Sequence, residues 1–534
     1  MGQIREKLIG GMPSLHHEHE SYKWWVLANV MIGTFMAVLD ATIVNVALSK
    51  IMATFGISVD KVEWVATGYL LVFAVMLPSS AWLADHLGYK RTYILGVFLF
   101  TLGSFLCGVA WDENALIAFR IVQGFGGGLL MPVGMAIITR EFPPEKRGVA
   151  LGFWTISAAA SVSLGPVIGG YLIDNFAWHA VFDVNVPVGI FAIVATIIIQ
   201  REYVVEETRS FDIVGFLSVA VFLTFLLLAL ADGNAAWNTG GWTSPFILSC
   251  FAISAVALVV FLVTEFTIEH PLIELRLLSD FNFAFTNMVF FIFGLGIFGS
   301  SFLLPLFLQN TLGYSAFQAG MFFLPVGIIQ GMVAPVAGYM SDKISPKIPA
   351  FIGMILLAIS LGLNYFLSLY SDHAQIMLPF YMRGFAAGLI FAPLSVLALY
   401  EIPRSKMAQA SGLFNVIRQV GGSLGVAIFG TVLLRRQLLH MQYYSESVQQ
   451  HTAAYLQPVA KLQWYVQHAA GGTAAESLMR AKALIGRHVA EQAFVSAVGD
   501  DFLIAGAITA ISAVLILLLK TKKRPNAGSM AAVE

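Results

Sequence analysis

Apolar residues run through this chain in long blocks, and polar residues are confined to the stretches between them. A helix that rises about 1.5 Å per residue needs about 20 mostly apolar residues to cross a hydrocarbon core of ~30 Å. We therefore predict an all-α polytopic membrane protein with fourteen transmembrane helices, which cover approximately residues 24–48, 62–83, 92–111, 114–138, 148–172, 178–199, 211–231, 245–264, 281–308, 317–340, 348–369, 374–399, 408–433 and 493–519.

The composition also favours lipid over water as the surrounding medium. Apolar residues make up 58% of the 534 residues and charged residues only 11%, whereas a soluble domain carries roughly 25% charged residues. The net charge of −1 gives no electrostatic reason to expect a nucleic-acid partner. The two cysteines, Cys107 and Cys250, lie in separate apolar blocks, so we expect packing residues and no metal site.

No sequence pattern points to an enzyme or to a bound cofactor. Glycine patterns at 294–299 and 421–425 match a dinucleotide-binding motif and a nucleophile elbow, but both lie inside apolar blocks. Those motifs require a strand-to-helix turn, so we interpret these glycines as helix-packing residues. The chain has no phosphate-binding loop of the type that would indicate direct use of ATP.

The positions of Lys and Arg predict the orientation in the membrane. Basic residues gather in alternate loops and in both tails, and the short loops of the opposite set hold only Lys50 and Lys61. By the positive-inside rule, we expect both termini to be cytoplasmic in a multi-pass protein of the cell (inner) membrane. Residues 1–23 form a polar leader, and the first block after it is interpreted as a retained helix and not as a signal peptide. Residues 520–534 form the cytoplasmic tail.

One segment on the far side, 434–492, is much longer than the other loops. It is polar and mildly amphipathic, and Gly471-Gly472 predicts a break between two helices. We expect a solvated cap; the alternative is a docking surface for an extracytoplasmic partner.

An internal repeat organises the spans into two halves. Pro78, Asp85, Lys90 and Gly96 recur with the same spacing 257 residues later. The recurring residues are Pro335, Asp342, Lys347 and Gly353. Two further matches, of 123–129 with 383–389 and of 163–170 with 423–430, keep the same order. We therefore predict two parallel six-helix halves, 24–200 and 281–519, joined by a linker, 201–280, that holds two inserted helices; carriers that rock about a midplane site have such halves.

Five stretches resemble the signature motifs of a known family. They are LDATIVNVAL at 39–48, ADHLGYKR at 84–91, RIVQGFGGG at 120–128, GPVIGG at 165–170 and VNVPVG at 184–189. Together with the fourteen spans they resemble the 14-helix drug:proton antiporters, the EmrB/QacA branch of the major facilitator superfamily. The resemblance extends from about residue 24 to 524. It implies the major facilitator fold and proton-driven export.

Asp40 and Arg120 are the leading candidates for proton coupling. Asp40 lies in the middle of the first span, where an ionised side chain costs about 2.5–3.5 kcal/mol on insertion scales. It is therefore expected to take up a proton on one side and release it on the other. The resemblance implies this role for Asp40 and a part in proton transfer for Arg120. The alternatives are a carboxylate permanently paired for packing and an arginine that only joins two helices.

Further candidates complete the predicted site. Asp183 is a second candidate proton site, although it lies near the outer end of its span, where an interfacial role fits about as well. The predicted substrate cavity comprises Met36, Asn45, Gln123, Met131, Asn415, Arg418 and Gln419. The charges expected to gate access are Asp85, Lys90, Arg91 and Asp342. The resemblance implies that Gly165, Pro166, Gly169 and Gly170 form the antiporter motif, which favours export over uptake.

We therefore predict a proton-coupled multidrug efflux antiporter that exports amphiphilic small molecules by alternating access, with protons and the lipid bilayer as its other partners. One alternative is a carrier of a single physiological solute such as a lipid, siderophore or organic acid. Another is an inner-membrane subunit that assembles with a periplasmic adaptor protein and an outer-membrane channel.

Overall fold

The structure is a computed structural model, and it describes residues 21–57, 59–203, 211–235, 237–269, 271–399, 402–403, 406–448, 453–471 and 473–519. Most of the predicted leader and the whole predicted tail lie outside these residues. The first half of the chain forms α2 (Tyr22–Phe55), α3 (Val59–Leu87), α4 (Tyr89–Gly108), α5 (Glu113–Glu141), η1 (Pro144–Lys146), α6 (Arg147–Asn175), α7 (Ala180–Asp183), α8 (Asn185–Ile199), α9 (Ile213–Asp232), η2 (Gly241–Thr243) and α10 (Pro245–Thr267). The second half forms η3 (Leu275–Ser279), α11 (Phe281–Asn310), α12 (Ala316–Met321), α13 (Phe323–Lys343), α14 (Lys347–Leu363), η4 (Asn364–Phe366), α15 (His373–Leu399), α16 (Met407–Ser447), α17 (Ala453–Ala470) and α18 (Ala474–Leu518).

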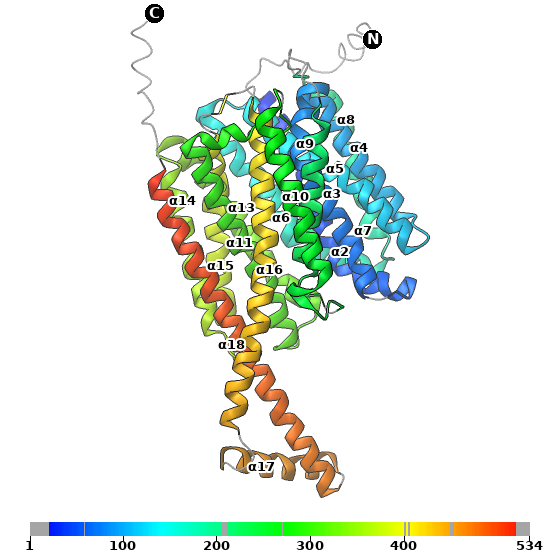
Figure 1. Ribbon diagram of the computed structural model, residues 1–534, viewed down its shortest axis with the longest axis vertical. Coiled ribbons are helices and arrows are strands. Elements are labelled where there is room, and N and C mark those ends of the chain that lie inside the picture. The colour runs from blue at the N-terminus through cyan, green and yellow to red at the C-terminus, as the bar shows by residue number, and fades with distance from the viewer. Residues whose placement is uncertain are drawn as a thin grey trace, which may run out of the picture.

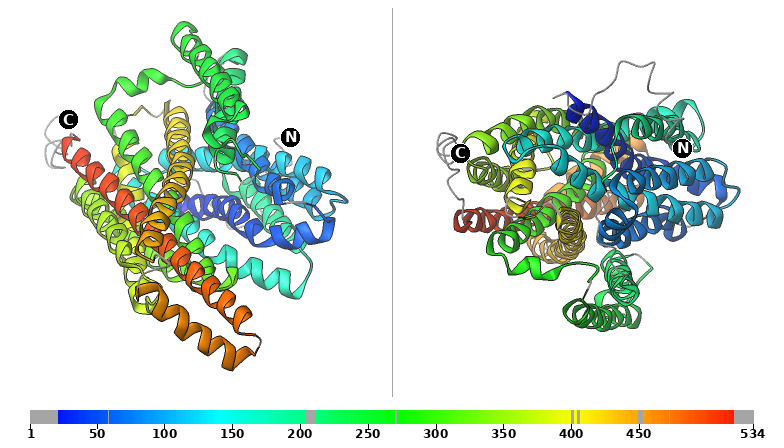
Figure 2. Two further views of the ribbon diagram at one scale, coloured as in Figure 1. Left: turned by 60° about the horizontal axis from the view of Figure 1, so that its bottom comes forward. Right: turned by 90° about the horizontal axis from the view of Figure 1, so that it is seen from above.

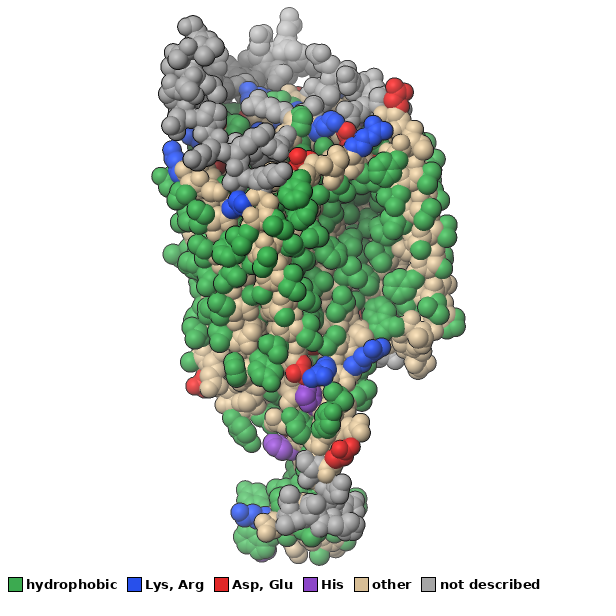
Figure 3. Space-filling view, turned by 60° about the vertical axis from the view of Figure 1, so that its left-hand side comes forward, with side chains coloured by type: hydrophobic (Ala, Val, Ile, Leu, Met, Phe, Trp, Pro, Cys, Tyr) green, Lys and Arg blue, Asp and Glu red, His purple; other side chains and the backbone are tan. Residues whose placement is uncertain are grey.

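The predicted all-helical membrane architecture is confirmed. The described residues contain fourteen helical segments that are long and apolar enough to cross a membrane, and each overlaps one predicted block. In the face shown in Figure 3, hydrophobic side chains cover the middle, and charged side chains gather towards the two ends. The middle of this surface therefore matches the hydrocarbon core of a membrane, because its apolar side chains do not need to be solvated by water.

The spans form two bundles with an additional helix pair at their side. One bundle contains α2–α6 and α8, and the other contains α11, α13–α16 and α18 (Figure 1). Seen from above, α9 and α10 stand at the periphery of both bundles (Figure 2). They pack on each other, and α9 also contacts α3 and α16. The inserted pair therefore touches both halves from outside.

The repeated glycines allow the two bundles to pack alike. A Cβ atom at Gly124 in α5 would lie 2.8 Å from the Tyr69 carbonyl oxygen of α3. A Cβ atom at Gly384 in α15 would lie 2.6 Å from the Val326 carbonyl oxygen of α13. Both distances are too short for a side chain, so glycine permits the same close helix contact in each half.

The two ends of the bundle differ in shape. At one end, which we name the terminal end, α2 begins and α18 ends (Figure 1). At the opposite end, the hairpin end, α16 and α18 continue out of the bundle, and α17 lies across their tip. Arg436 Nε and His440 Nε2 of α16 lie 2.6 and 2.7 Å from Asp500 Oδ2 of α18, which joins the two helices where they leave the bundle.

The sequence predicted two helices and a break in this region, and the break after α17 occurs at Gly471, whose φ is 65°. The structure differs from the prediction in the rest of the segment 434–492, whose described residues form no separate helix apart from α17. Residues 434–447 extend α16 and residues 474–492 extend α18, because neither a proline nor a left-handed glycine interrupts these two helices.

Candidate functional site

A buried cluster of polar side chains lies around Asp40 within the first bundle. Arg120 Nη1 donates to Asp40 Oδ2 at 2.5 Å, and Gln123 Nε2 donates to Asp40 Oδ1 at 2.8 Å. Asn185 Nδ2 donates to the same Oδ1 at 3.1 Å. Asp40, Arg120, Gln123 and Asn185 are each at most 2% exposed. The carboxylate is therefore satisfied by three donors from two other helices, α5 and α8, with no access to solvent in this state.

The other side of Arg120 is also fixed. Its Nε donates to the Val65 carbonyl oxygen of α3 at 2.9 Å, and Nη1 also donates to Gln123 Oε1 at 2.6 Å. The guanidinium carbon lies 4.2 Å from the centre of the Tyr69 ring, within the range of a cation–π contact. Arg120 therefore keeps favourable contacts that do not involve Asp40.

Helical spacing explains why these residues meet. Arg120 and Gln123 are three residues apart in α5 and share one face of that helix, which is directed towards α2. Gln123 Nε2 also donates to Ser104 Oγ of α4 at 2.6 Å. The cluster thus receives side chains from α2, α4, α5 and α8 and a carbonyl from α3, so five helices of one half share a single network.

The structure does not bring Asp183 into this cluster. Asp183 ends the short helix α7 and is exposed. A Cβ atom at Gly108 would contact its carboxylate, which places Asp183 beside the hairpin end of α4. Sequence reasoning had assigned no role to Asn185, which is in the cluster. The signal was available, because Asn185 is a side-chain amide in an apolar span, where polar residues are expensive.

The equivalent position in the second half holds an arginine without a partner. The repeat aligns Arg383 of α15 with Gln123 of α5. Arg383 is 2% exposed, and its three guanidinium nitrogens have no hydrogen-bond partner among the described residues. The guanidinium carbon lies 4.7 Å from the Phe380 ring centre. The two halves are therefore chemically unequal at their matching sites.

The residues of the predicted substrate cavity are distributed unevenly. Met36 and Met131 are buried within the first bundle, Gln123 belongs to the Asp40 cluster, and Asn45 is exposed. In α16, Asn415 is buried, and Arg418 and Gln419 are half-buried. Arg418 Nη2 donates to Asn415 Oδ1 at 3.4 Å. The structure therefore pairs two of the predicted residues in the second half, apart from those in the first.

Aromatic rings join the two halves near Arg418. The ring of Trp154 in α6 lies 5.8 Å from that of Phe391 in α15, and Phe391 lies 5.6 Å from Phe290 in α11. Phe290 in turn lies 4.1 Å from Phe414 in α16. The Arg418 guanidinium carbon is 5.8 Å from the Phe391 ring centre. This aromatic group, Trp154, Phe290, Phe391 and Phe414, was not identified by sequence reasoning.

The GPVIGG stretch lies where α6 contacts both halves. A Cβ atom at Gly165 would lie 2.8 Å from the Thr42 Cβ of α2, and one at Gly169 would lie 2.9 Å from Ile43 Cγ1 of the same helix. A Cβ atom at Gly170 would instead lie 2.8 Å from Phe317 Cδ2 of α12. Pro166, inside α6, faces Gly320 of α12. Side chains at these glycines would separate α6 from its neighbours.

Among the predicted gating residues, Asp342 makes a contact between the halves. Its Oδ1 accepts from the Gly148 backbone N–H at 3.0 Å, and its Oδ2 accepts from the Val149 N–H at 2.9 Å. A carboxylate is favoured at a helix N-terminus by unpaired N–H groups and by the helix dipole. Asp342 therefore holds the end of α13 to the first turn of α6 at the terminal end.

The other predicted gating charges lie within the first half. Lys90 Nζ donates to the Ile197 and Gln200 carbonyl oxygens at 2.6 Å each, at the C-terminal end of α8. Its repeat partner Lys347 binds the end of α18 through the Leu517 and Leu519 carbonyl oxygens.

The remaining two predicted gating residues, Asp85 and Arg91, also lie near the terminal end. Asp85 is buried and accepts from the Tyr89 hydroxyl at 3.1 Å. Arg91 is exposed and lies 3.7 Å from Glu202 Oε2.

Among the residues that the structure describes, no group of three or more His, Cys, Asp and Glu side chains is placed to hold a metal ion.

The chain is similar in sequence to transport proteins over most of its length. The family model described as Major Facilitator Superfamily matches residues 30–426. The multidrug resistance protein B homolog of Mycobacterium tuberculosis is 35% identical over 416 residues, which cover 77% of this chain and 76% of that protein. The multidrug export protein EmrB of Escherichia coli is 30% identical over 419 residues, which cover 78% and 81%. The uncharacterized MFS-type transporter YhcA of Bacillus subtilis is 30% identical over 78% of this chain and 77% of its own length.

Two solved structures share the fold. The human organic anion transporter MFSD10 (TETRAN) matches with a TM-score of 0.58 at 11% identity, over 91% of this chain and 99% of its own. A bacterial homolog of the human lysosomal transporter Spinster, solved in an inward-facing and unoccupied conformation, matches with a TM-score of 0.51 at 17% identity, over 94% and 99%. At these identities the likeness extends to the fold alone.

Proposed function

The chain belongs to the major facilitator superfamily, and we propose that it is a proton-coupled antiporter that exports amphiphilic small molecules across the cell (inner) membrane. Both termini would be cytoplasmic, so the terminal end faces the cytoplasm and the hairpin end faces outward. The observation that carries this proposal is the buried ion pair of Asp40 and Arg120. The names of two of these relatives, a multidrug resistance protein B homolog and a multidrug export protein, support the substrate class.

Protonation of Asp40 is the proposed coupling step. The ionised carboxylate attracts the charged Arg120 and accepts from Gln123 and Asn185. A proton on Asp40 removes the charge that makes its bond to Arg120 strong, while Arg120 retains the Val65 carbonyl, Gln123 and the Tyr69 ring. Proton uptake would thus loosen α2 from α5 and α8 without leaving Arg120 unsupported.

The proposed route from this pair to the gate runs through α2 and α6. Thr42 and Ile43, which lie two and three residues after Asp40 in α2, meet the glycines of the α6 antiporter motif. The first turn of α6 is held by Asp342 of the other half. A small shift of α2 would therefore reach the contact that joins the halves at the cytoplasmic end. We propose Asp342 as the gating residue, and Lys90 as the residue that fixes α8 in its own half.

The substrate is proposed to bind between the halves, against the aromatic group of Trp154, Phe290, Phe391 and Phe414. These rings come from α6 of one half and from α11, α15 and α16 of the other. Flat apolar rings suit varied amphiphilic molecules, because they supply contact area without a fixed set of hydrogen bonds. Arg418 and Asn415 at the edge of the group would orient a polar end of the substrate.

A proton gradient is sufficient for such export. One proton that crosses a potential of about 100 mV yields about 2.3 kcal/mol, and one pH unit adds about 1.4 kcal/mol. Together these support roughly a 500-fold gradient of a neutral substrate.

Proton release on addition of substrates tests the proposal against the carrier of a single solute. Purified protein in proteoliposomes is exposed to a panel of chemically unrelated amphiphiles and to a matched panel of hydrophilic solutes. We expect many amphiphiles to move protons and the hydrophilic solutes to move none. A response to one solute alone would instead identify a dedicated carrier, and no response to any compound would contradict proton coupling.

A second candidate role, as the inner-membrane subunit of a tripartite assembly, is favoured by the surface of α17. Trp464 and Tyr465 of α17 are more than half exposed, as is Met479 in the extension of α18, and this helix lies outside the bundle (Figure 1). A periplasmic adaptor protein that leads to an outer-membrane channel would find apolar anchors here. Replacement of residues 448–473 by a Gly/Ser linker of equal length tests this role. Loss of export from cells with retained transport in proteoliposomes supports it; export unchanged in both settings excludes it.

A further inference from the structure

A second deeply buried carboxyl group, that of Asp501, lies in α18 within the last predicted span and has no part in the proposed coupling step. Asp501 is 0% exposed, and Ala497 and Ala505, one helical turn away on either side, are equally buried. Among the residues that the structure describes, neither Oδ1 nor Oδ2 of Asp501 has a hydrogen-bond partner. Asp40, in contrast, accepts from three donors. The two buried carboxyl groups therefore differ in their surroundings.

The charged groups beside Asp501 are bonded to its neighbour in the chain. Asp500 and Arg436 are the charges that act on Asp501 electrostatically. Arg436 Nε donates to Asp500 Oδ2 at 2.6 Å, and His440 Nε2 lies 2.7 Å from the same oxygen. The Arg436 side chain is also 40% exposed, so water screens its charge. One permanent cation thus stands beside two carboxyl groups, and it is bonded to the outer one.

The other elements that pack against α18 place no bonded base beside Asp501. These elements are α11, α14, α16, α17 and η4. No residue of α11 is charged, and Lys347 of α14 binds the far end of α18. Tyr365 of η4 is 46% exposed. Arg383 of α15 lies 5.6 Å from the Phe502 ring centre, and its guanidinium has no hydrogen-bond partner in the described part of the chain.

The remaining titratable side chains of these elements are not buried. In α16 and α17 they are Arg435, Tyr443, Tyr444, Glu446, Tyr455, Lys461, Tyr465 and His468. The other charged residues of α18 lie in its extension beyond the bundle. Asp501 therefore has no bonded counter-charge among the described residues.

This environment favours the neutral form of Asp501. An ionised carboxylate is far more costly to bury than a neutral acid, and hydrogen bonds or a bonded counter-charge normally offset the cost. Asp501 has neither in this state. We therefore expect a proton on its carboxyl group.

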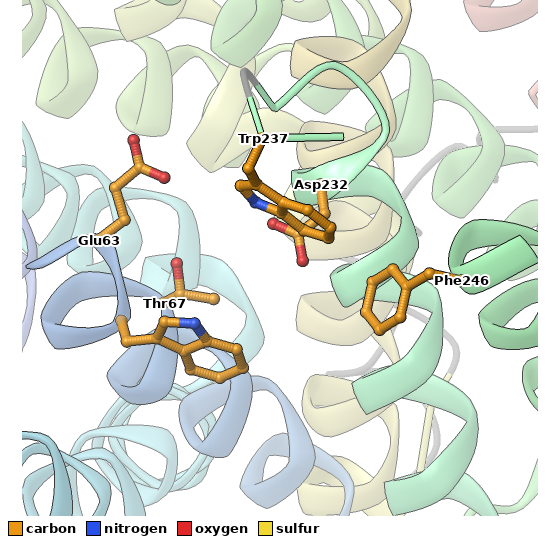
Figure 4. A pocket seen from close by; sticks show the side chains of 6 residues that line it. Glu63, Thr67, Asp232, Trp237 and Phe246 are labelled. Atoms are coloured by element: carbon orange, nitrogen blue, oxygen red, sulfur yellow. The ribbon is translucent and has the colours of Figure 1, made fainter. Parts of the chain in front are cut away.

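A short route leads from Asp501 to the hairpin end. Asp500 precedes it in α18 and is 15% exposed, and His440, in contact with Asp500, is 19% exposed. Histidine gains and loses protons near neutral pH, so this pair connects water with the buried acid. A cavity of about 280 Å³ at the same end offers no other route, because its lining residues come from α3, α9, α10 and the loop between the last two (Figure 4).

From this geometry we propose that Asp501 is a proton-binding site of the second half, loaded from the hairpin end through His440 and Asp500. Its proton is exchanged with that side of the membrane and does not travel to Asp40, which lies in the other half. When the proton is bound, α18 packs against α11 and α14. Loss of the proton leaves a buried negative charge, which favours separation of α18 from these helices. The site thus responds to the proton supply at the hairpin end.

Infrared spectroscopy of the purified full chain tests whether Asp501 holds a proton. It needs no transport step, so the result is independent of proton-coupled export. At pH 7 exposed carboxyl groups, with a pKa of about 4, are ionised. The spectrum of the wild type minus that of Asp501→Asn is expected to contain the C=O band of one protonated carboxyl group. Asp174→Asn, which changes an exposed carboxylate of α6, should reveal no such band. Its absence with Asp501→Asn as well would overturn the proposal.

The pH at which this band disappears tests the route. His440→Gln removes a group that can hold a compensating positive charge, so the band should persist to a pH about 1 unit higher. Asp500→Asn removes the neighbouring negative charge, so the band should disappear at a pH about 1 unit lower. His468→Gln, a change of an exposed histidine in α17, should have no effect. A band that responds to neither His440→Gln nor Asp500→Asn would contradict the assigned route.

Hydrogen exchange tests the effect on packing. Above the pH at which the band disappears, α18 around Asp501 should exchange faster in the wild type than in Asp501→Asn at the same pH. The difference is expected to grow by up to about tenfold per pH unit. In proteoliposomes with the hairpin end outward, the pH of the bath alone should produce it. Equal exchange in both chains at every pH, or a response only to the pH of the lumen, would overturn the proposal.

Discussion

At the scale of single residues, the buried pair of Asp40 and Arg120 determines what the first bundle can do. Charged side chains within a membrane protein are almost always paired or hydrogen-bonded, and this network satisfies the Asp40 carboxylate with three donors. In the mechanism that we propose, the same pairing would make the network sensitive to a proton, because neutralising Asp40 would change every contact around it. A permanent structural pair and a proton-responsive pair have the same geometry, so measurements on variants must separate them.

A thermodynamic cycle on this pair gives the first residue-scale prediction. Arg120→Gln leaves the Asp40 carboxylate buried without its counter-charge, and we expect a loss of about 3–5 kcal/mol in the free energy of unfolding. The double variant Asp40→Asn/Arg120→Gln removes both charges and is expected to recover most of this loss. The measurement is denaturant unfolding in detergent, followed by tryptophan fluorescence.

The exposed pair of Lys61 and Glu113 is the matched control for that cycle. It joins α3 and α5 in the same bundle, and Lys61 is 62% exposed. Its coupling energy should be about 0–1 kcal/mol. Additive effects of the Asp40 and Arg120 substitutions, with no more coupling than in the control pair, would show that the pair contributes little to stability.

The sequence identified the members of this pair but not the whole network. Asp40 and Arg120 are each unusual because they are charged residues within apolar spans, and the resemblance implied their roles. Asn185 is marked in the sequence only as an amide in an apolar span, and its contact with Asp40 depends on how α8 packs in the bundle. The sequence also could not predict that the Arg383 guanidinium has no hydrogen-bond partner among the described residues, because this depends on which residues surround it in the fold.

At the scale of elements, short contacts at helix ends decide which parts move together. Lys90 and Lys347 each bind the carbonyl end of the last helix in their own half. Asp342, in contrast, binds the amide end of a helix in the other half. Three residues from one repeated motif thus make two contacts within the halves, through Lys90 and Lys347, and one contact between the halves, through Asp342. The fourteen spans could be predicted from the length of the apolar blocks. Which charged residue makes a contact within its own half, and which makes one between the halves, could be read only from the folded structure.

The bridging contact gives the element-scale prediction. Asp342→Asn removes the negative charge that accepts from Gly148 and Val149, and bonds to a charged group contribute about 1.5–3 kcal/mol each. We expect hydrogen exchange at the first turn of α6 to become about 10- to 100-fold faster.

Asp280→Asn is the control for this experiment. Asp280 caps α11 through the Phe283 N–H at 2.8 Å and makes this contact within one half. Its substitution should speed exchange at α11 and leave α6 unchanged. Unchanged exchange at α6 in Asp342→Asn would argue against a gate at this position.

At the scale of the whole molecule, two bundles of similar architecture have unequal interiors. The first bundle holds the buried ion pair of Asp40 and Arg120, and the second presents Arg418 to the aromatic group between the halves. The inserted pair touches both bundles from outside, at α3 and at α16. The internal repeat predicted the two halves from sequence. The long extensions of α16 and α18 were not predicted, because hydrophobic length marks only the part of a helix that faces lipid.

Substrate-driven proton movement in proteoliposomes is the most direct test of the central claim, that Asp40 and Arg120 couple export to protons. The wild-type chain is compared with Asp40→Asn/Arg120→Gln, in which no buried charge is left unpaired, and with Asp183→Asn, an equivalent change outside the network. We predict that the wild type and Asp183→Asn move protons when substrate is added. The double variant should move substrate down its gradient without moving protons. Proton movement of wild-type size in the double variant would contradict the account.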